Sequence, residues 1–168
     1  MAKPSLTAAR LRELLHYEPE TGVFTWTQNR YRVFKGDVAG NHGVQGYTII
    51  GIERRTYRAH RLAWLYVHGD WPAADIDHLN GVRHDNRLSN LRDVDRRTNL
   101  QNLNRAKRQN KSGFLGVCCD KNQKQGKRWI AQIKAEGSPR VLGYFETPEE
   151  AQQAYLNAKR QHHKGCTI

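Results

Sequence analysis

Four residues between positions 77 and 99 have side chains that could act together on a phosphate: Asp77, His78, Asn90 and Asn99. An imidazole has an unperturbed pKa of about 6.5, so it can accept a proton from water near neutral pH. A carboxylate and an amide oxygen are hard ligands of the kind that suits Mg²⁺. These groups are therefore candidates for phosphodiester hydrolysis. The alternative is that the Asp–His pair is structural and the asparagines are turn and cap residues.

Short strands and a helix must position these side chains. Adjacent residues of a strand point to opposite faces unless the strand ends or bulges there, which bears directly on Asp77 and His78. The expected elements are a strand over 76–79, a turn at 80–81, a loop over 82–91, a returning strand over 91–94 and a helix over 96–105. Three other histidines, His60, His68 and His84, are expected to be surface or hydrogen-bonding residues.

The flanking segments predict two further groups of elements. Before the candidate site we expect a helix over 8–17, a strand over 23–27, a loop over 28–46, a hairpin of 47–52 with 56–59, and a helix over 60–68. After it we expect strands over 114–119, 128–133 and 140–145, then a helix over 148–162 that Thr147 caps. The polar, basic stretch 104–112 between the two groups is typical of a linker.

Composition restricts the class of partner. The chain has 168 residues and a formal net charge of +12, and residues 77–111 hold nine Lys/Arg against four Asp/Glu. Such an excess predicts a polyanionic partner, most simply nucleic acid. No stretch approaches the ~20 apolar residues of a spanning helix, and we expect neither a membrane span nor a signal peptide. Three cysteines, two of them adjacent, make a poor disulfide framework and fit a reducing compartment.

Residues 77–92, followed by Asn99, resemble the HNH endonuclease motif, with the phage and intron-encoded homing branch as the nearest match. The upstream segments 14–26, 46–47 and 60–64 are also similar to such proteins. The resemblance implies a ββα-metal fold in which His78 is the general base and Asn90 pins the loop to the hairpin. It further implies that Asp77 and Asn99 hold one divalent cation, Mg²⁺, Mn²⁺ or another. No Cys-x-x-Cys pair is present, so we do not expect a structural zinc.

Residues 113–160 resemble the plant Apetala-two/ethylene-response DNA-binding domain, which also occurs fused to phage homing nucleases. The matching positions are 116–117, 129–133, 142–145, Thr147, 149–151 and 154–155. The resemblance implies a three-stranded sheet that lies in the major groove and contacts DNA through Arg and Trp side chains. Cys118 and Cys119 stand where that family usually has arginines. Trp129 could instead be a packed core residue.

The sequence therefore predicts an α+β protein with an HNH nuclease module followed by a three-stranded antiparallel sheet plus helix. The expected domains are 1–103, a basic linker over 104–112, and 113–168. We expect a metal-dependent, homing-type endonuclease acting on double-stranded DNA, encoded by a phage or mobile element and located in the cytoplasm of a bacterial host. The expected DNA contacts are Arg83, Arg87, Arg96, Arg97, Arg105, Lys107, Arg108, Lys111, Lys127, Arg128, Trp129 and Arg140.

Two alternatives remain open at this stage. The first is a sequence-specific DNA-binding regulator whose nuclease module is inactive, and the complete Asp77, His78, Asn90 and Asn99 set argues against it. The second is an RNA-binding protein, but the chain lacks the aromatic-rich motifs of the common RNA-binding modules. No role follows from the sequence for the residues that precede the hairpin.

Overall fold

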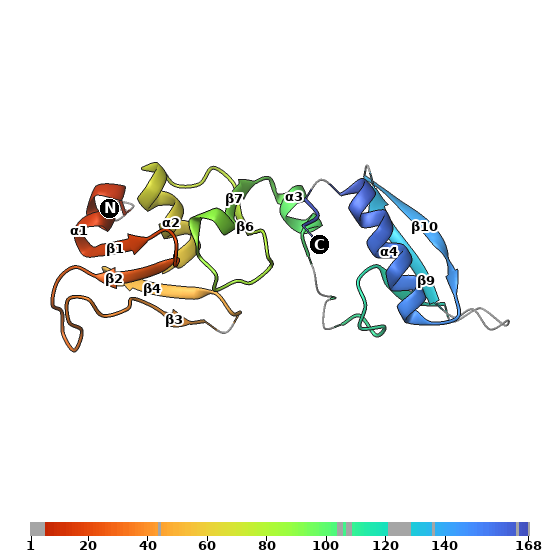
Figure 1. Cartoon of the computed structure of the whole chain (residues 1–168), viewed down its shortest axis with the longest axis horizontal. Helices are drawn as coiled ribbons and strands as arrows, with labels where there is room; N and C mark the ends of the chain where they lie inside the picture. Colours follow the sequence, from red (N-terminus) through yellow and green to blue (C-terminus); the bar gives the residue numbers. More distant parts are fainter. Residues whose placement is uncertain are drawn as a thin grey trace. The chain divides into compact units, whose positions relative to one another are not determined.

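The computed structural model describes residues 6–43, 45–103, 106, 109–120, 129–135, 137–163 and 165–167. The chain divides into two compact units, Met1–Arg96 and Arg97–Ile168. Both units combine small antiparallel sheets with helices (Figure 1), which confirms the expected α+β class. Among the described residues, no helix has the length and apolar character that crossing a lipid bilayer requires.

The first unit begins with a short helix and a two-stranded sheet. Helix α1 (Ala8–Leu14) starts at Thr7, whose hydroxyl oxygen accepts a hydrogen bond from the Arg10 backbone N–H. Strand β1 (Leu15–Glu18) pairs antiparallel with β2 (Val23–Trp26). The prediction of a helix through residue 17 is therefore wrong. Pairing with β2 buries Leu15 and Tyr17 on one face, and this tertiary burial outweighs the helical spacing of the leucines.

A three-stranded sheet and a second helix follow. The sheet contains β3 (Asn41–His42), β4 (Thr48–Ile52) and β5 (Arg55–Arg58), in that order. A two-residue turn joins β4 to β5, with φ of 50° at Glu53 and 63° at Arg54, as the twist of a tight hairpin requires. Helix α2 (Ala59–His68) ends at Gly69, which adopts the left-handed conformation. The hairpin and this helix agree with expectation, whereas β3 lies in the stretch predicted to be a loop.

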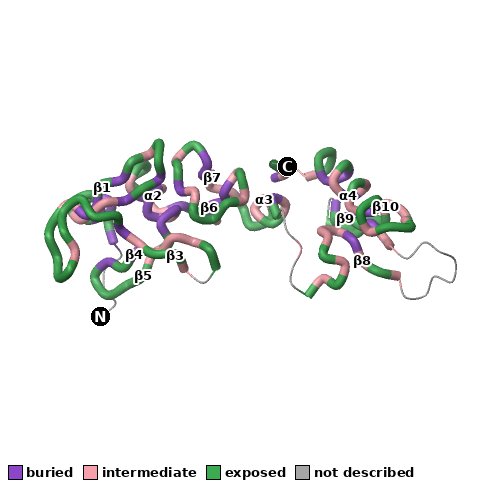
Figure 2. Tube along the Cα trace, turned by 60° about the horizontal axis from the view of Figure 1, so that its bottom comes forward, coloured by how far each residue is buried: buried purple, intermediate pink, exposed green. Residues whose placement is uncertain are grey.

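One hydrophobic core supports all of these elements and the candidate site. Its least exposed side chains come from α1, β1, β2, β4 and α2, and the buried segments are visible in Figure 2. Ile76 and Leu91 join the same core from the hairpin formed by β6 (Asp75–His78) and β7 (Leu91–Val94). The 3₁₀ turn η1 (Leu88–Asn90) immediately precedes β7. The core therefore fixes the hairpin from both of its strands.

The second unit contains helix α3 (Arg96–Gln101), which begins at the boundary, and a sheet covered by one helix. Helix α3 ends before the predicted position 105, and its last turn is closed by the Asn102 N–H, which donates to the Asn99 carbonyl three residues earlier at 3.2 Å. Lys159 Nζ donates to the Leu103 carbonyl at 2.5 Å, and the Gly165 N–H donates to the Gln101 side chain. These bonds join the segment after Arg96 to the C-terminal residues. The boundary between the two compact units therefore lies before the predicted linker over 104–112.

The sheet of this unit has the order β10-β9-β8 and is antiparallel throughout. Its strands are β8 (Val117–Cys119), β9 (Trp129–Ala135) and β10 (Ser138–Phe145), and helix α4 is Pro148–His162. Thr147 and Glu150 form the capping box that the sequence predicts. A Cβ at Gly116 would lie 2.0 Å from the Tyr155 ring, so only glycine allows α4 to approach this closely. The predicted three strands plus helix are confirmed.

Candidate active site

Asp77 and His78 occupy the last two positions of β6, and both side chains are buried. Across the hairpin, Asp77 is the register partner of Arg92 and His78 is the partner of Leu91. The Arg92 guanidinium donates two hydrogen bonds to Asp77 Oδ2, from Nε at 3.0 Å and from Nη2 at 2.8 Å. This ion pair orients the carboxylate at the point where the strand ends.

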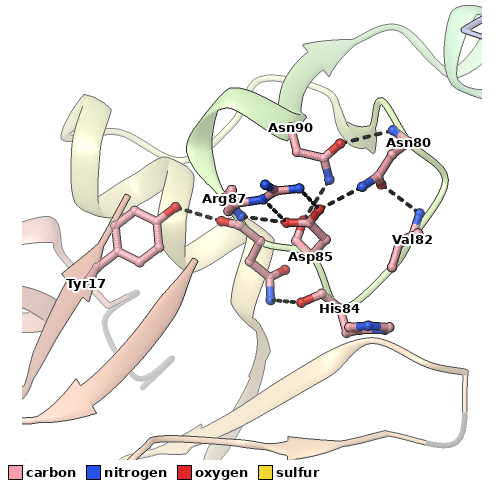
Figure 3. A network of polar contacts seen from close by, with 8 residues as sticks. Tyr17, Asn80, Val82, His84, Asp85, Arg87 and Asn90 are labelled. Carbon is pink, nitrogen blue, oxygen red and sulfur yellow. Dashed lines mark hydrogen bonds and ion pairs between the residues drawn. The ribbon is translucent and has the colours of Figure 1, made fainter. Parts of the chain in front are cut away.

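Asn90 holds the loop that follows His78. Its Oδ1 accepts a hydrogen bond from the Asn80 N–H at 3.0 Å, and its Nδ2 donates to the Asp85 carbonyl at 2.8 Å. The Asn90 carbonyl also accepts from the Leu79 N–H at 2.9 Å. One buried amide, at the end of η1, therefore ties the start and the middle of the loop to the residue that precedes β7 (Figure 3).

Asp85 makes the second set of loop contacts, also drawn in Figure 3. Its carboxylate accepts from Asn80 Nδ2 at 2.7 Å and from Arg87 at 2.6 and 2.8 Å. The hydrogen bonds from Arg87, more than the one from Asn80, lower the pKa of Asp85 to about 2. Asp85 is therefore ionised at neutral pH, and its carboxylate holds Asn80 and Arg87 in place within the loop.

The loop is also anchored to the N-terminal sheet. The buried Tyr17 hydroxyl donates to the Asn86 carbonyl at 2.7 Å. A Cβ on Gly22 would lie 2.4 Å from the backbone of Asn86 and Arg87, so the turn between β1 and β2 needs glycine here. The N-terminal sheet thus supports the site, which gives these residues a structural role that the sequence did not reveal.

Burial lowers the pKa of His78 below its usual value, and the positive charge of Arg83 acts in the same direction. Interaction with the Asn86 side chain opposes this shift, as do the carboxylates of Asp77 and Asp85. The net direction is downward, so the His78 imidazole is neutral at neutral pH. A neutral imidazole can accept a proton, which is the property that a general base requires.

His60 was expected to be a surface or hydrogen-bonding residue, but it is buried and lies against the candidate base. It is 3% exposed, and its ring meets that of His78 edge to face with centroids 4.9 Å apart. Tyr47 contacts both rings, at 5.1 Å from His60 and 6.0 Å from His78. Burial first, and then the charges near it, lower the pKa of His60 to about 3, so it is also neutral. Helical periodicity could not identify this contact, because it joins α2 to β6.

Two arginines flank this group of rings. Arg58 and Arg83 lie over the Tyr47 ring, 4.6 and 5.1 Å from its centroid, and both are exposed. Arg83 also donates to the Gln45 carbonyl at 2.8 Å. The surroundings of His78 are therefore positively charged, which suits the approach of a phosphate. His84, predicted to be a surface or hydrogen-bonding residue, is exposed and its ring contacts that of His42.

Asn99 lies in α3, within the second unit, and its side chain is half-buried. The positions of the two units relative to one another are not determined, so the convergence of Asn99 on Asp77 stays a prediction. Among the described residues, no group of three or more His, Cys, Asp or Glu side chains could hold a metal ion. The predicted set of one carboxylate and one amide oxygen leaves most positions of a hard cation to water and phosphate, as Mg²⁺ prefers.

The predicted DNA contacts fall into four groups. Arg87 and Arg96 are exposed but form ion pairs, with Asp85 at 2.6 Å and Asp75 at 3.0 Å. Arg83, Arg97, Lys111 and Arg140 are also exposed, and among the described residues no ion pair is present for Arg83, Arg97 or Lys111. Trp129 is half-buried and packs against the hydrophobic core of the second unit, which includes Val117, Ala131 and Ile133. Arg105, Lys107, Arg108, Lys127 and Arg128 lie outside the described residues.

Comparison with known proteins finds a family whose model matches the hairpin. Residues 57–101 match the model of the HNH endonuclease family. A solved structure that describes DNA binding and cleavage by the HNH homing endonuclease I-HmuI has a TM-score of 0.43 with this chain and 22% sequence identity. That alignment covers 90% of this chain and 88% of the other. No significant match is found among curated proteins. The matched residues 57–101 contain α2 and the β6–β7 hairpin, so the similarity to the HNH endonuclease family covers the candidate site.

Proposed function

We propose that this protein is a metal-dependent DNA endonuclease of the homing type. The observation that carries the proposal is the buried, neutral imidazole of His78 at the end of β6, beside an oriented carboxylate and within the residues that match the HNH endonuclease family. A nuclease domain needs a base that is deprotonated at neutral pH, and burial provides one here. His78 would take a proton from the water that attacks the scissile phosphate.

Asp77 and Asn99 are the residues that would hold the cation, Mg²⁺, Mn²⁺ or a similar divalent ion. When bound, such an ion supplies positive charge that stabilises the phosphate and the leaving 3′ oxygen. The contribution of Arg92 is to fix the orientation of the Asp77 carboxylate. Asn90 contributes indirectly, because it sets the conformation of the loop next to the base.

Double-stranded DNA is the proposed substrate. The formal net charge of +12 and the exposed arginines around His78 support a polyanion. The second unit would add affinity as an Apetala-two-like domain, with the exposed Arg140 and the half-buried Trp129 on its sheet as contacts. Lys111 and the basic segment before it would track the backbone without sequence preference.

One observation favours a second candidate, a DNA-binding regulator with an inactive nuclease module. Both hydrogen bonds from Arg92 go to Oδ2 of Asp77, so the carboxylate that should hold a cation is already neutralised. A regulator would bind DNA and never cut it. The two candidate functions therefore differ in one property, the cleavage of DNA, which a single assay measures.

The test is cleavage of supercoiled plasmid by the full chain in Mg²⁺, in Mn²⁺ and in EDTA. We expect nicked or linear product with a divalent ion and none in EDTA. His78→Ala should lose cleavage, whereas His68→Ala, an exposed histidine at the end of α2, should retain it. Intact plasmid under every condition, together with DNA binding, would support the regulator instead.

A further inference from the structure

The segment 27–38, here named the aromatic loop, connects β2 to the residues before β3 and is held by its own hydrogen bonds. Arg30 and Val33 exchange two backbone bonds, of 2.8 and 3.0 Å, which close a tight turn. A second turn follows at once, in which the Phe34 N–H donates to Asp37 Oδ2 at 2.7 Å and the Asp37 N–H donates to the Phe34 carbonyl at 3.0 Å. The conformation is therefore fixed before any partner binds.

Backbone bonds attach this loop firmly to the sheet. The Trp26 N–H donates to the Asp37 carbonyl at 2.9 Å, and the Gly36 N–H donates to the Trp26 carbonyl at 2.8 Å. Arg32 adopts a positive φ of 55° at the tip, a conformation that a residue with a side chain adopts at a cost. A strained tip on a well-anchored loop indicates that the position of the tip matters.

The aromatic loop presents the most exposed large hydrophobic side chains among the described residues. Tyr31 is 84% exposed, Val38 is 68% exposed and Phe34 is 67% exposed. Aromatic side chains normally bury most of their surface, and grouped exposure marks a binding surface. None of the packing within the first unit explains why these side chains point to solvent.

Positive charge accompanies the exposed rings. Arg30, Arg32 and Lys35 lie in the same loop, and within the described part of the chain none of them forms an ion pair. Arg32 lies over the Tyr31 ring at 5.1 Å from its centroid. The one carboxylate of the loop, Asp37, is used to hold the Phe34 N–H. Lysine is depleted in protein–protein interfaces, whereas alternating cations and aromatic rings are typical of nucleic-acid surfaces.

We propose that the aromatic loop is a second DNA-binding element, in which Tyr31 and Phe34 contact bases while Arg32 and Lys35 neutralise phosphates. The proposal rests on the endonuclease function above, because the DNA is the same substrate at some distance from the cut. It assigns a ligand to a loop in the region that precedes the hairpin, for which no role follows from the sequence alone. The loop would add affinity and position the duplex without taking part in the chemistry.

The test measures DNA binding by the full chain carrying His78→Ala, which cannot cut. The probe is a fluorescein-labelled, mixed-sequence duplex followed by anisotropy over a range of salt concentrations. Tyr31→Ala with Phe34→Ala should weaken binding by roughly ten- to a hundredfold, because the contacts of the two rings with base edges in a groove of the duplex are lost. Arg32→Gln with Lys35→Gln should reduce the slope of log K against log salt by about two, roughly one for each phosphate contact.

Matched variants separate binding from folding. Tyr31→Phe with Phe34→Tyr keeps both rings and should bind like the parent, and Val67→Ala removes an exposed side chain of α2 and should also have no effect. Arg10→Gln removes a cation already paired with Glu13 and Glu53, so the salt slope should not change. Thermal melting should be the same for the alanine pair and its parent, because the two rings are exposed.

Two results would overturn the proposal. One is that the alanine pair binds DNA as tightly as its parent. The other is that it changes only self-association, measured by light scattering, which would assign the surface to a second copy of the chain. Plasmid cleavage by the otherwise unaltered chain is scored separately. Loop-dependent binding without any cleavage would refute the endonuclease alone, and cleavage without loop-dependent binding would refute the loop alone.

Discussion

The active-site loop (79–90) and the aromatic loop use the same device for opposite purposes. In each, a side-chain carboxylate or amide accepts a hydrogen bond from a backbone N–H: Asn90 from Asn80, and Asp37 from Phe34. Asn90 is buried and its loop adjoins a buried imidazole, whereas the loop of Asp37 presents exposed rings. The comparison shows that local bonding sets loop conformation, while the surrounding core decides whether the loop encloses a reactive group or offers a surface.

Among the substitutions in the two loops, the largest effect on stability and cleavage should come from the active-site loop, whose Asn90 is buried. Asn90→Ala leaves the Asn80 N–H and the Asp85 carbonyl without the bonds that the side chain makes. We expect a loss of about 2–4 kcal/mol in the free energy of unfolding and a fall in cleavage of roughly a hundredfold. Chemical denaturation and single-turnover cleavage measure the two. Asn90→Asp keeps the acceptor and should be intermediate, and an alanine variant as stable as wild type would contradict the assignment.

His60 should have the next largest effect. His60→Ala removes the ring that meets His78 edge to face, so the base loses a neighbour that restricts its orientation. We expect kcat to fall roughly ten- to a hundredfold at saturating DNA, with the Kd for DNA nearly unchanged. His60→Phe restores a ring and should recover most of kcat. If phenylalanine and alanine are equally impaired, His60 acts through its nitrogens rather than through packing.

The pH dependence of cleavage tests how the surroundings of His78 set the pKa of its imidazole. His78 must be neutral to accept a proton, and burial lowers its pKa, so the acidic limb of kcat should have its midpoint below the ordinary histidine value of about 6.5. Arg83 also lowers this pKa, so Arg83→Gln should move the acidic limb to higher pH. Arg10→Gln serves as the matched control and should leave the profile in place. A limb above the ordinary histidine value would exclude His78 as the base.

The smallest effect should come from the exposed loop. Asp37→Ala removes one exposed hydrogen bond from the Phe34 N–H, so we expect the free energy of unfolding to fall by about 0.5–1 kcal/mol. DNA binding should weaken a few-fold, because the aromatic loop is no longer fixed in advance. Asp37→Asn keeps an acceptor and should preserve binding. The value of kcat at saturating DNA should be unchanged in both variants, and a large loss would mean that the two loops are not independent.

The sequence predicts those features of the fold that are decided by neighbouring residues. The capping box of α4 and the β6–β7 hairpin are of this kind, because Thr147 with Glu150, and Asn80 with Gly81, specify them locally. The extent of α1 is not decided by neighbouring residues. Residues 15–18 form a strand only because β2 pairs with them. The burial that stabilises that strand belongs to the tertiary core.

The candidate site divides in the same way. The types and spacing of Asp77 and His78 reveal the chemistry, and the match of residues 57–101 to the HNH endonuclease family agrees with it. The buried neighbour His60 was missed because its contact with His78 crosses from α2 to β6. The anchoring of Asn86 by Tyr17 was missed for the same reason, as the two residues lie far apart in the sequence. The role of Asn99 as a ligand stays a prediction.

The role of His78 as the general base is tested most directly by the single-turnover rate of DNA cleavage. That rate is measured for His78→Ala at saturating DNA and Mg²⁺ and compared with wild type. We expect a rate lower by roughly a hundred- to ten-thousandfold, with the Kd for DNA within about twofold of wild type. We also expect that EDTA abolishes the wild-type rate. A variant that cleaves within a few-fold of wild type would contradict His78 as the general base.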